Sequence, residues 1–260
     1  MNHPVQLQER DGVLTITLDR PKANAIDVST SRSLFAAFER LQNDPALRVG
    51  IVTGSGRFFS AGWDLNAANE GEAITADHGP GGFAGLTEYF ELSKPVIAAV
   101  NGLAIGGGFE LALAADLMVA SEQAEFALPE VTLGMIPDSG GVLRLPRRLP
   151  RVLATELLMT GRRMGAAEAQ RWGLVNQVVP ADALLDAAQG LATRVAQGAP
   201  LALAAIKEVL RETETQDLRT AYRTLRGAGL IAYPAMLQSE DAVEGPLAFA
   251  QKRTARWKGR

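Results

Sequence analysis

Two strand-like segments, separated by three consecutive glycines and an apolar helix, place the tightest constraint on the fold. Val96–Val100 is apolar throughout, which suits a buried strand, and glycines 106–108 follow a few residues later. Phe109–Ala115 is apolar except for Glu110, which predicts a helix buried on all sides. Leu117–Ser121 predicts the next strand. This order of strand, helix and strand is typical of an α/β core.

Other segments extend this alternation and then depart from it. Asp11-Gly12 predicts a hairpin of residues 5–9 and 13–18, and residues 48–53 predict another strand. Helices are expected after Asp27, near 86–92 at the end of a long loop from residue 66, from Ser139, at 151–159, 166–172, 181–197 and 200–213, and through most of the tail from Leu218. We therefore expect an α/β core in residues 1–195 and an α-helical region in residues 196–260.

Composition argues against several classes of function. The chain has no Cys, which excludes a disulfide scaffold and a thiolate site, and a histidine metal site or catalytic triad would depend on His78 alone. A net charge of −3 gives no general attraction to nucleic acid or to an anionic membrane. The apolar runs are too short to span a bilayer, and the polar N-terminal segment predicts no signal peptide. We expect a cytoplasmic protein without a metal, a nucleic-acid partner or a membrane partner.

Two glycine-rich segments fail as nucleotide-binding motifs. Residues 54–56 follow a strand, but Phe59 stands where the dinucleotide fingerprint requires a third small residue. A phosphate loop beginning at Gly102 would need Lys and Ser/Thr where Gly108 and Phe109 stand. Neither segment therefore predicts a bound nucleotide.

The glycine triplet and Glu110 form the first candidate catalytic feature. Glycines after a strand let a ligand approach the main chain, and the following helix presents free N–H groups to an oxyanion. Tight packing of the turn is the alternative explanation for the glycines alone. Burying an unpaired carboxylate is costly, so Glu110 is expected to be paired, protonated or catalytic. A buried Glu–Arg pair or a helix-dipole contact is the structural alternative.

A second carboxylate and a second source of amides complete the pattern. Glu130 follows Glu110 after one helix and one strand, so the two carboxylates could flank one pocket and divide acid and base roles. Glu130 could equally cap the next element. Phe58–Asp64 suggests a strand that turns sharply and exposes main-chain N–H groups. One donor from each turn would make a two-point oxyanion hole for a thioester enolate.

These features resemble the crotonase (enoyl-CoA hydratase/isomerase) superfamily over nearly the whole chain. The motifs that carry the resemblance are Ser60-Ala61-Gly62-Trp63-Asp64, Asn101-Gly102, Gly106-Gly107-Gly108 with Glu110, Pro129-Glu130 and Ile136-Pro137-Asp138-Ser139-Gly140-Gly141. The resemblance implies an α/β spiral of ββα units with an α-helical C-terminal trimerisation region. It also implies an acyl-CoA thioester substrate, no permanently bound cofactor, and a homotrimer or dimer of trimers.

The resemblance also implies roles for individual residues. Glu110 holds and activates water, Glu130 exchanges the proton at C2, and the backbone N–H groups of Trp63 and Gly107 form the oxyanion hole. Hydratases of the family use both glutamates, and this chain has both. The CoA-binding positions are Lys22, Ala23, Asn24, Ala61, Asp64 and Leu65, together with Phe249 and Lys252, which usually reach the CoA of a neighbouring subunit.

Within the superfamily the chain looks most like the carnitinyl-CoA dehydratases (crotonobetainyl-CoA hydratases), a resemblance carried by residues 58–65, 79–85, 126–145, 160–165 and 239–253. Residues 66–92 hold five Asp and Glu but no Lys or Arg, and aromatic residues gather in the same region. Such groups suit a trimethylammonium tail, although a solvated acidic loop over core aromatics explains them equally well. The candidate tail-binding residues are Trp63, Phe83, Tyr89 and Asp138.

Asp138 has two interpretations, and the function has three. In dienoyl-CoA isomerases a carboxylate at this place handles protons, but we favour a capping role for Asp138 in the helix expected from Ser139. A 4-trimethylammonio enoyl-CoA hydratase/dehydratase is the leading function. A general enoyl-CoA hydratase or enoyl/dienoyl-CoA isomerase is the alternative enzyme. A non-catalytic CoA- or RNA-binding protein is the third, against which the two glutamates and the acidic balance argue.

Overall fold

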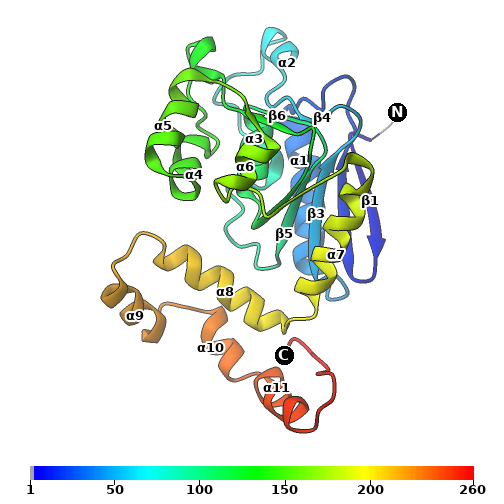
Figure 1. The fold of residues 1–260 in the computed structure, drawn as a ribbon, viewed down its shortest axis with the longest axis vertical. Helices are drawn as coiled ribbons and strands as arrows, with labels where there is room; N and C mark the ends of the chain where they lie inside the picture. The colour runs from blue at the N-terminus through cyan, green and yellow to red at the C-terminus, as the bar shows by residue number, and fades with distance from the viewer. Residues whose placement is uncertain (1–2) are drawn as a thin grey trace.

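The computed structural model describes residues 3–260 and contains two β-sheets with helices around them (Figure 1). The larger sheet has the strand order β1-β2-β3-β5-β7-β10, and the smaller has the order β4-β6-β8-β9. The strands are β1 Val5–Arg10, β2 Val13–Leu18, β3 Val49–Gly54, β4 Phe58–Ser60, β5 Val96–Val100, β6 Leu103–Ile105, β7 Leu117–Ser121, β8 Glu125–Ala127, β9 Met164–Gly165 and β10 Gln177–Val179. The antiparallel pair β1–β2 confirms the predicted hairpin, and the other neighbours in the larger sheet are parallel.

Most helices lie close to the bounds expected from the sequence. They are α1 Val28–Asn43, α2 Leu65–Asn69, α3 Gly107–Ala114, α4 Gly141–Arg148, α5 Arg151–Thr160, α6 Ala166–Arg171, α7 Leu184–Ala196, α8 Pro200–Thr213, α9 Leu218–Arg226, α10 Ala232–Leu237 and α11 Glu240–Ala250. Helix α1 begins where predicted because the Asp27 carboxylate accepts a hydrogen bond from the Thr30 amide at 2.7 Å. Its apolar face, with Leu34, Phe38 and Leu41, is fully buried.

The helix expected near residues 86–92 does not form, so that prediction was wrong. A 3₁₀ turn at Phe83–Gly85 is followed only by further turns. Gly85 has a φ of +67° and packs so closely on α1 that an added Cβ would lie 2.2 Å from the Phe35 nitrogen. This left-handed, tightly packed backbone cannot continue as a right-handed helix.

Three parallel strands of the smaller sheet end at one edge. Strands β4, β6 and β8 run in the same direction, so the segments that leave their carboxyl ends emerge together. These segments are residues 61–63, 106–107 and 128–130. In α/β proteins, ligands bind outside the carboxyl ends of parallel strands, so a ligand-binding site is expected at this edge.

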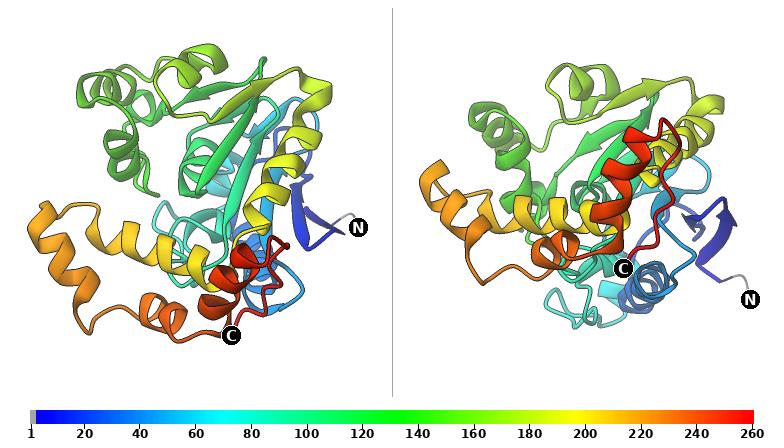
Figure 2. Two further views of the ribbon diagram at one scale, coloured as in Figure 1. Left: turned by 60° about the horizontal axis from the view of Figure 1, so that its bottom comes forward. Right: turned by 90° about the horizontal axis from the view of Figure 1, so that it is seen from below.

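Helices α8 to α11 extend away from the two sheets as an arm (Figures 1 and 2). These helices and the N-cap of α10 carry large apolar side chains that are exposed in the single chain: Ile206, Leu210, Leu218, Ile231, Val243 and Phe249. In residues 3–260, no helix is both long and apolar enough to cross a membrane.

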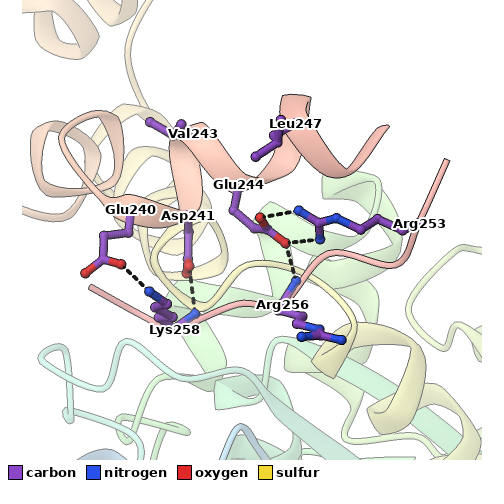
Figure 3. Close-up of a pocket in the computed structure, with 8 residues that line it drawn as sticks. All are labelled: Glu240, Asp241, Val243, Glu244, Leu247, Arg253, Arg256 and Lys258. Atoms are coloured by element: carbon purple, nitrogen blue, oxygen red, sulfur yellow. Dashed lines mark hydrogen bonds and ion pairs between the residues drawn. The ribbon is translucent and has the colours of Figure 1, made fainter. Parts of the chain in front are cut away.

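The last residues fold back along α11 and are held there by ion pairs (Figure 3). The Glu244 carboxylate accepts hydrogen bonds from Arg253 at 2.6 and 2.8 Å, and Lys258 pairs with Glu240 at 2.6 Å. Buried Asp241 accepts a hydrogen bond from the Lys258 amide at 2.7 Å. An open cavity of about 680 Å³ lies among these charged groups, and no predicted site residue lines it.

Candidate active site

A cavity of about 830 Å³ lies at the edge where β4, β6 and β8 end. Its lining comprises Ala61, Trp63 and Leu65 after β4, Ile74–Gly79, Gly82, Phe83 and Glu88 from the following loop, Ile105–Gly107 and Glu110 from β6 and α3, and Pro129, Glu130, Leu133–Ile136, Asp138 and Ser139 after β8. The cavity therefore brings together both predicted glutamates and both predicted amide turns, which lie far apart in the sequence.

The two amide turns are in direct contact with each other. Gly62 has a φ of +81°, and an added Cβ there would lie 2.6 Å from the Gly107 nitrogen and 2.8 Å from the Ile105 carbonyl oxygen. The amides of Trp63 and Gly107 have no hydrogen-bond partner among residues 3–260. For Gly107 this follows from its place as the first residue of α3, where amides lack a partner within the helix. The turns can thus present two free N–H groups at one wall of the cavity.

Glu110 is buried in the first turn of α3 and is only 3% exposed. Its Oε1 accepts a hydrogen bond from the Gly141 amide at 2.7 Å, so its partner is the N-terminus of α4 rather than an arginine. Burial raises the pKa of Glu110 to about 8, and the negative charges of Glu130 and Asp138 act in the same direction. The hydrogen bond and the nearby Arg144 oppose this shift without cancelling it. At neutral pH Glu110 is therefore mostly protonated.

Glu130 begins the 3₁₀ turn Glu130–Leu133 and lies beside the glycine triplet. A Cβ added to Gly106 would lie 2.8 Å from Glu130 Oε1, so only glycine leaves room for this carboxylate. Its Oε2 is buried and has no hydrogen-bond partner in residues 3–260. Burial raises the pKa of Glu130, and the charge of Asp138 raises it further. A carboxylate that lines a cavity and keeps one oxygen without a hydrogen-bond partner is suited to exchanging a proton with a ligand.

Asp138 does not cap a helix, so the interpretation that we favoured from the sequence was wrong. Helix α4 begins at Gly141, and Gly140, with a φ of 114°, occupies the N-cap position without a side-chain hydrogen bond. The first turn of α4 uses the Glu110 carboxylate as a partner instead. Asp138 is exposed and lines the cavity, where it is the third carboxylate near the two glutamates.

The predicted CoA-binding residues fall into three groups. Ala61 and Leu65 line the cavity, and Lys22 and Ala23 lie on the adjoining segment, where the Ala61 amide donates to the Ala23 carbonyl at 2.9 Å. Asn24 and Asp64 are buried. Asp64 has a structural role, because it forms an ion pair with Arg20 at 2.5 Å and caps α2. Phe249 and Lys252 are exposed and do not line the cavity of their own chain.

Two of the three aromatic residues expected at the acyl tail line the cavity. These are Trp63 and Phe83, whereas Tyr89 packs against Phe35 with ring centroids 5.0 Å apart and lies outside the cavity lining. His78 also lines the cavity, although no pattern in the sequence singled it out as a site residue. Its Nδ1 lies 2.8 Å from Ser31 Oγ, and burial lowers the pKa of the imidazole. Only the folded chain reveals this contact, because 47 residues separate its two partners.

Known proteins resemble the chain along its whole length. It is 59% identical to the carnitinyl-CoA dehydratases of Proteus mirabilis (strain HI4320) and Escherichia coli (strain K12), with 100% of each chain covered. Among solved structures, the enoyl-CoA hydratase from Mycobacterium tuberculosis H37Rv is 41% identical, with a TM-score of 0.90 over 99% of both chains. The carnitinyl-CoA hydratase from Mycobacterium avium is 43% identical, with a TM-score of 0.78 over 100% of both chains.

These similarities confirm the predicted crotonase-like α/β fold. Residues 8–260 match the family described as enoyl-CoA hydratase/isomerase. Fold, cavity and sequence thus agree that the chain belongs to the enoyl-CoA hydratase/isomerase family.

Proposed function

We propose that this protein is an acyl-CoA hydratase/dehydratase that adds or removes water across the C2=C3 bond of an enoyl-CoA thioester. The observation that carries the proposal is the meeting of two carboxylates, the buried Glu110 and the half-buried Glu130, in one cavity walled by two turns with free amides. A carboxylate pair supplies the acid and the base that water addition needs, and free amides supply an oxyanion hole. The family and the names of the similar proteins support this reaction.

In the dehydration direction, Glu130 removes the C2 proton and the thioester oxygen gains negative charge. The N–H groups of Trp63 and Gly107 stabilise this enolate, and losing one such donor typically costs about 3–4 kcal/mol. Protonated Glu110 then gives its proton to the C3 hydroxyl, which leaves as water while the C2=C3 bond forms. In hydration Glu110 takes a proton from the water that attacks C3, and Glu130 returns a proton to C2. The raised pKa of Glu110 suits the acid role in dehydration.

We further propose that the acyl tail carries a quaternary ammonium group, as in carnitinyl-CoA and crotonobetainyl-CoA. In the described chain the cavity lining contains no Lys or Arg, whereas Asp77, Glu88 and Asp138 add three carboxylates to the two glutamates. Trp63 and Phe83 add aromatic rings, whose faces attract cations. The relatives named carnitinyl-CoA dehydratase, at 59% identity, support the same substrate.

An enoyl-CoA hydratase or enoyl/dienoyl-CoA isomerase for ordinary acyl chains is the second candidate. It is favoured by the apolar residues Ile74, Leu133 and Ile136 in the lining, and by Asp138 as a third proton-exchanging group. Comparing kcat/KM for crotonyl-CoA and crotonobetainyl-CoA separates the two candidates. We expect the higher value for crotonobetainyl-CoA; preference for crotonyl-CoA would support the second candidate, and hydration of neither would contradict the proposed reaction.

The remaining parts of the sequence prediction stand as proposals. Residues 1–195 hold the active site, and residues 196–260 form the interface of a homotrimer or a dimer of trimers. Exposed apolar side chains on α8 to α11 support this arrangement, because such faces need a partner. Phe249 and Lys252 would then contact the CoA of a neighbouring subunit. CoA enters as part of the substrate, with no permanently bound cofactor, and the cytoplasmic location stays a prediction.

A further inference from the structure

The carboxylate of Glu72 joins the loop after α2 to two other segments. Its Oε1 accepts a hydrogen bond from Trp63 Nε1 at 2.9 Å, and its Oε2 accepts one from the Val28 amide at 3.0 Å. Val28 is the first residue of α1, and amides at this position have no partner within the helix. One carboxylate therefore ties the indole ring of Trp63 to the N-terminus of α1.

The main chain of Trp63 is held without any help from its side chain. The Ile26 amide donates to the Gly62 carbonyl at 2.8 Å, and the Asp64 amide donates to the Ile26 carbonyl at 3.0 Å. These bonds fix the peptide groups on both sides of Trp63, and with them the direction of its free N–H. The indole depends on Glu72 for its hydrogen bond, packs against the core and lines the cavity.

Glu72 itself does not line the cavity. We propose that Glu72 is a positioning residue: by accepting the indole N–H, it holds the Trp63 ring where the ring meets the acyl tail, and it thereby sets the selectivity for a quaternary ammonium tail. This inference rests on the proposed function, since it assigns a role within the same cavity. The oxyanion donor and the tail contact would thus reside on one residue but be positioned by different hydrogen bonds.

Kinetics with two substrates test this separation. Glu72→Ala should raise KM for crotonobetainyl-CoA at least about tenfold, which corresponds to about 1.4 kcal/mol, because the ring loses its orientation. The kcat for both substrates should change by less than about threefold, because the backbone bonds around Trp63 remain. Glu70→Ala is the matched control: Glu70 is exposed on the same segment, does not line the cavity and makes no side-chain hydrogen bond within residues 3–260.

A double-mutant cycle distinguishes positioning from direct attraction between Glu72 and the cation. Trp63→Phe keeps an aromatic ring but removes the indole N–H, so adding Glu72→Ala to it should cause little further rise in KM. If the carboxylate acted directly on the cation, Glu72→Ala would raise KM equally in both backgrounds, and that result would overturn the proposal.

A spectroscopic measurement tests the position of the ring without relying on activity. The chain has three Trp, so 5-fluorotryptophan labelling gives three ¹⁹F resonances, and Trp63→Phe identifies the one from residue 63. Glu72→Ala should shift that resonance and Glu70→Ala should not; an unshifted resonance would refute positioning by Glu72. If Glu72→Ala does not fold, Glu72→Gln takes its place: it loses one of the two acceptor oxygens, so it should still shift the resonance of residue 63, whereas Glu70→Gln should not. A wild type that hydrates neither substrate would instead contradict the proposed function and leave the ¹⁹F result valid.

Discussion

Replacing Gly62 by alanine should separate the two amide turns and disable the enzyme. The new Cβ would lie 2.6 Å from the Gly107 nitrogen and 2.8 Å from the Ile105 oxygen, where ordinary contact begins near 3.4 Å. The turns must therefore move apart by about 0.6–0.8 Å at the wall that presents the oxyanion donors. Loss of one donor lowers kcat by about 10²–10³, and a displacement of this size should cost a similar factor. The φ of +81° adds about 1–2 kcal/mol of backbone strain.

Gly56→Ala is a control that introduces the backbone strain of a positive φ without displacing a neighbouring turn. Gly56 has a φ of +72° but no atom within 4 Å of its added Cβ, so this variant carries the strain alone. We expect Gly56→Ala to lose about 1–2 kcal/mol of unfolding free energy by thermal or urea denaturation, and Gly62→Ala to lose about 1–3 kcal/mol more because of its steric overlap. Only Gly62→Ala should lose about a hundredfold in kcat for hydration, measured at saturating enoyl-CoA. A Gly62→Ala enzyme with kcat within threefold of the wild type would refute the role assigned to these turns.

Three further predictions concern the carboxylates and the assembly. Glu110→Gln and Glu130→Gln should each lower kcat for hydration by at least about 10², and near-normal turnover of either would exclude the two-carboxylate mechanism. The pKa of Glu110 is raised from 4.5 to about 8, so the folded state binds this proton more tightly than the unfolded state does. The protonated side chain therefore stabilises the fold fully below about pH 4.5, and this stabilisation is lost as the pH rises to about 8. Urea titrations should therefore show that the free energy of unfolding of Glu110→Gln rises relative to that of the wild type across this range, by up to about 4 kcal/mol at pH 8. A difference that stays constant with pH would argue against the raised pKa. Light scattering at micromolar concentration should return a trimer or hexamer, and a monomer would contradict the interface proposed for residues 196–260.

The core and the catalytic edge were largely predictable because local patterns determine them. Apolar runs predicted the strands, the glycine triplet predicted a turn with free amides, and Glu110 stood out as a charge in an apolar helix. That the turns at Gly62 and Gly107 meet was expected from the family resemblance, because no local pattern in the sequence indicates it. It follows from the parallel direction of β4 and β6, which places their following turns side by side.

The errors lie where tertiary contacts override local preference. Residues 86–92 have helix-like apolar spacing, but the close packing of Gly85 on α1 imposes a left-handed backbone before that segment. Asp138 looked like a cap, yet Gly140 can begin α4 without one because the Glu110 carboxylate meets the first turn from another element. No local pattern distinguishes Tyr89, which packs on α1, from Phe83, which lines the cavity.

The segments of the cavity wall have separate tasks, and this separation has a consequence for engineering. The proposed catalytic groups stand on the turns after β4 and β8 and in the first turn of α3, whereas residues 66–92 contribute a large share of the wall. Exchange of residues 66–92, which include Glu72, together with Trp63 is therefore the smallest graft that would retarget the enzyme to another acyl tail. The groups that transfer protons would be unchanged, so such chimaeras should accept different substrates but keep their kcat.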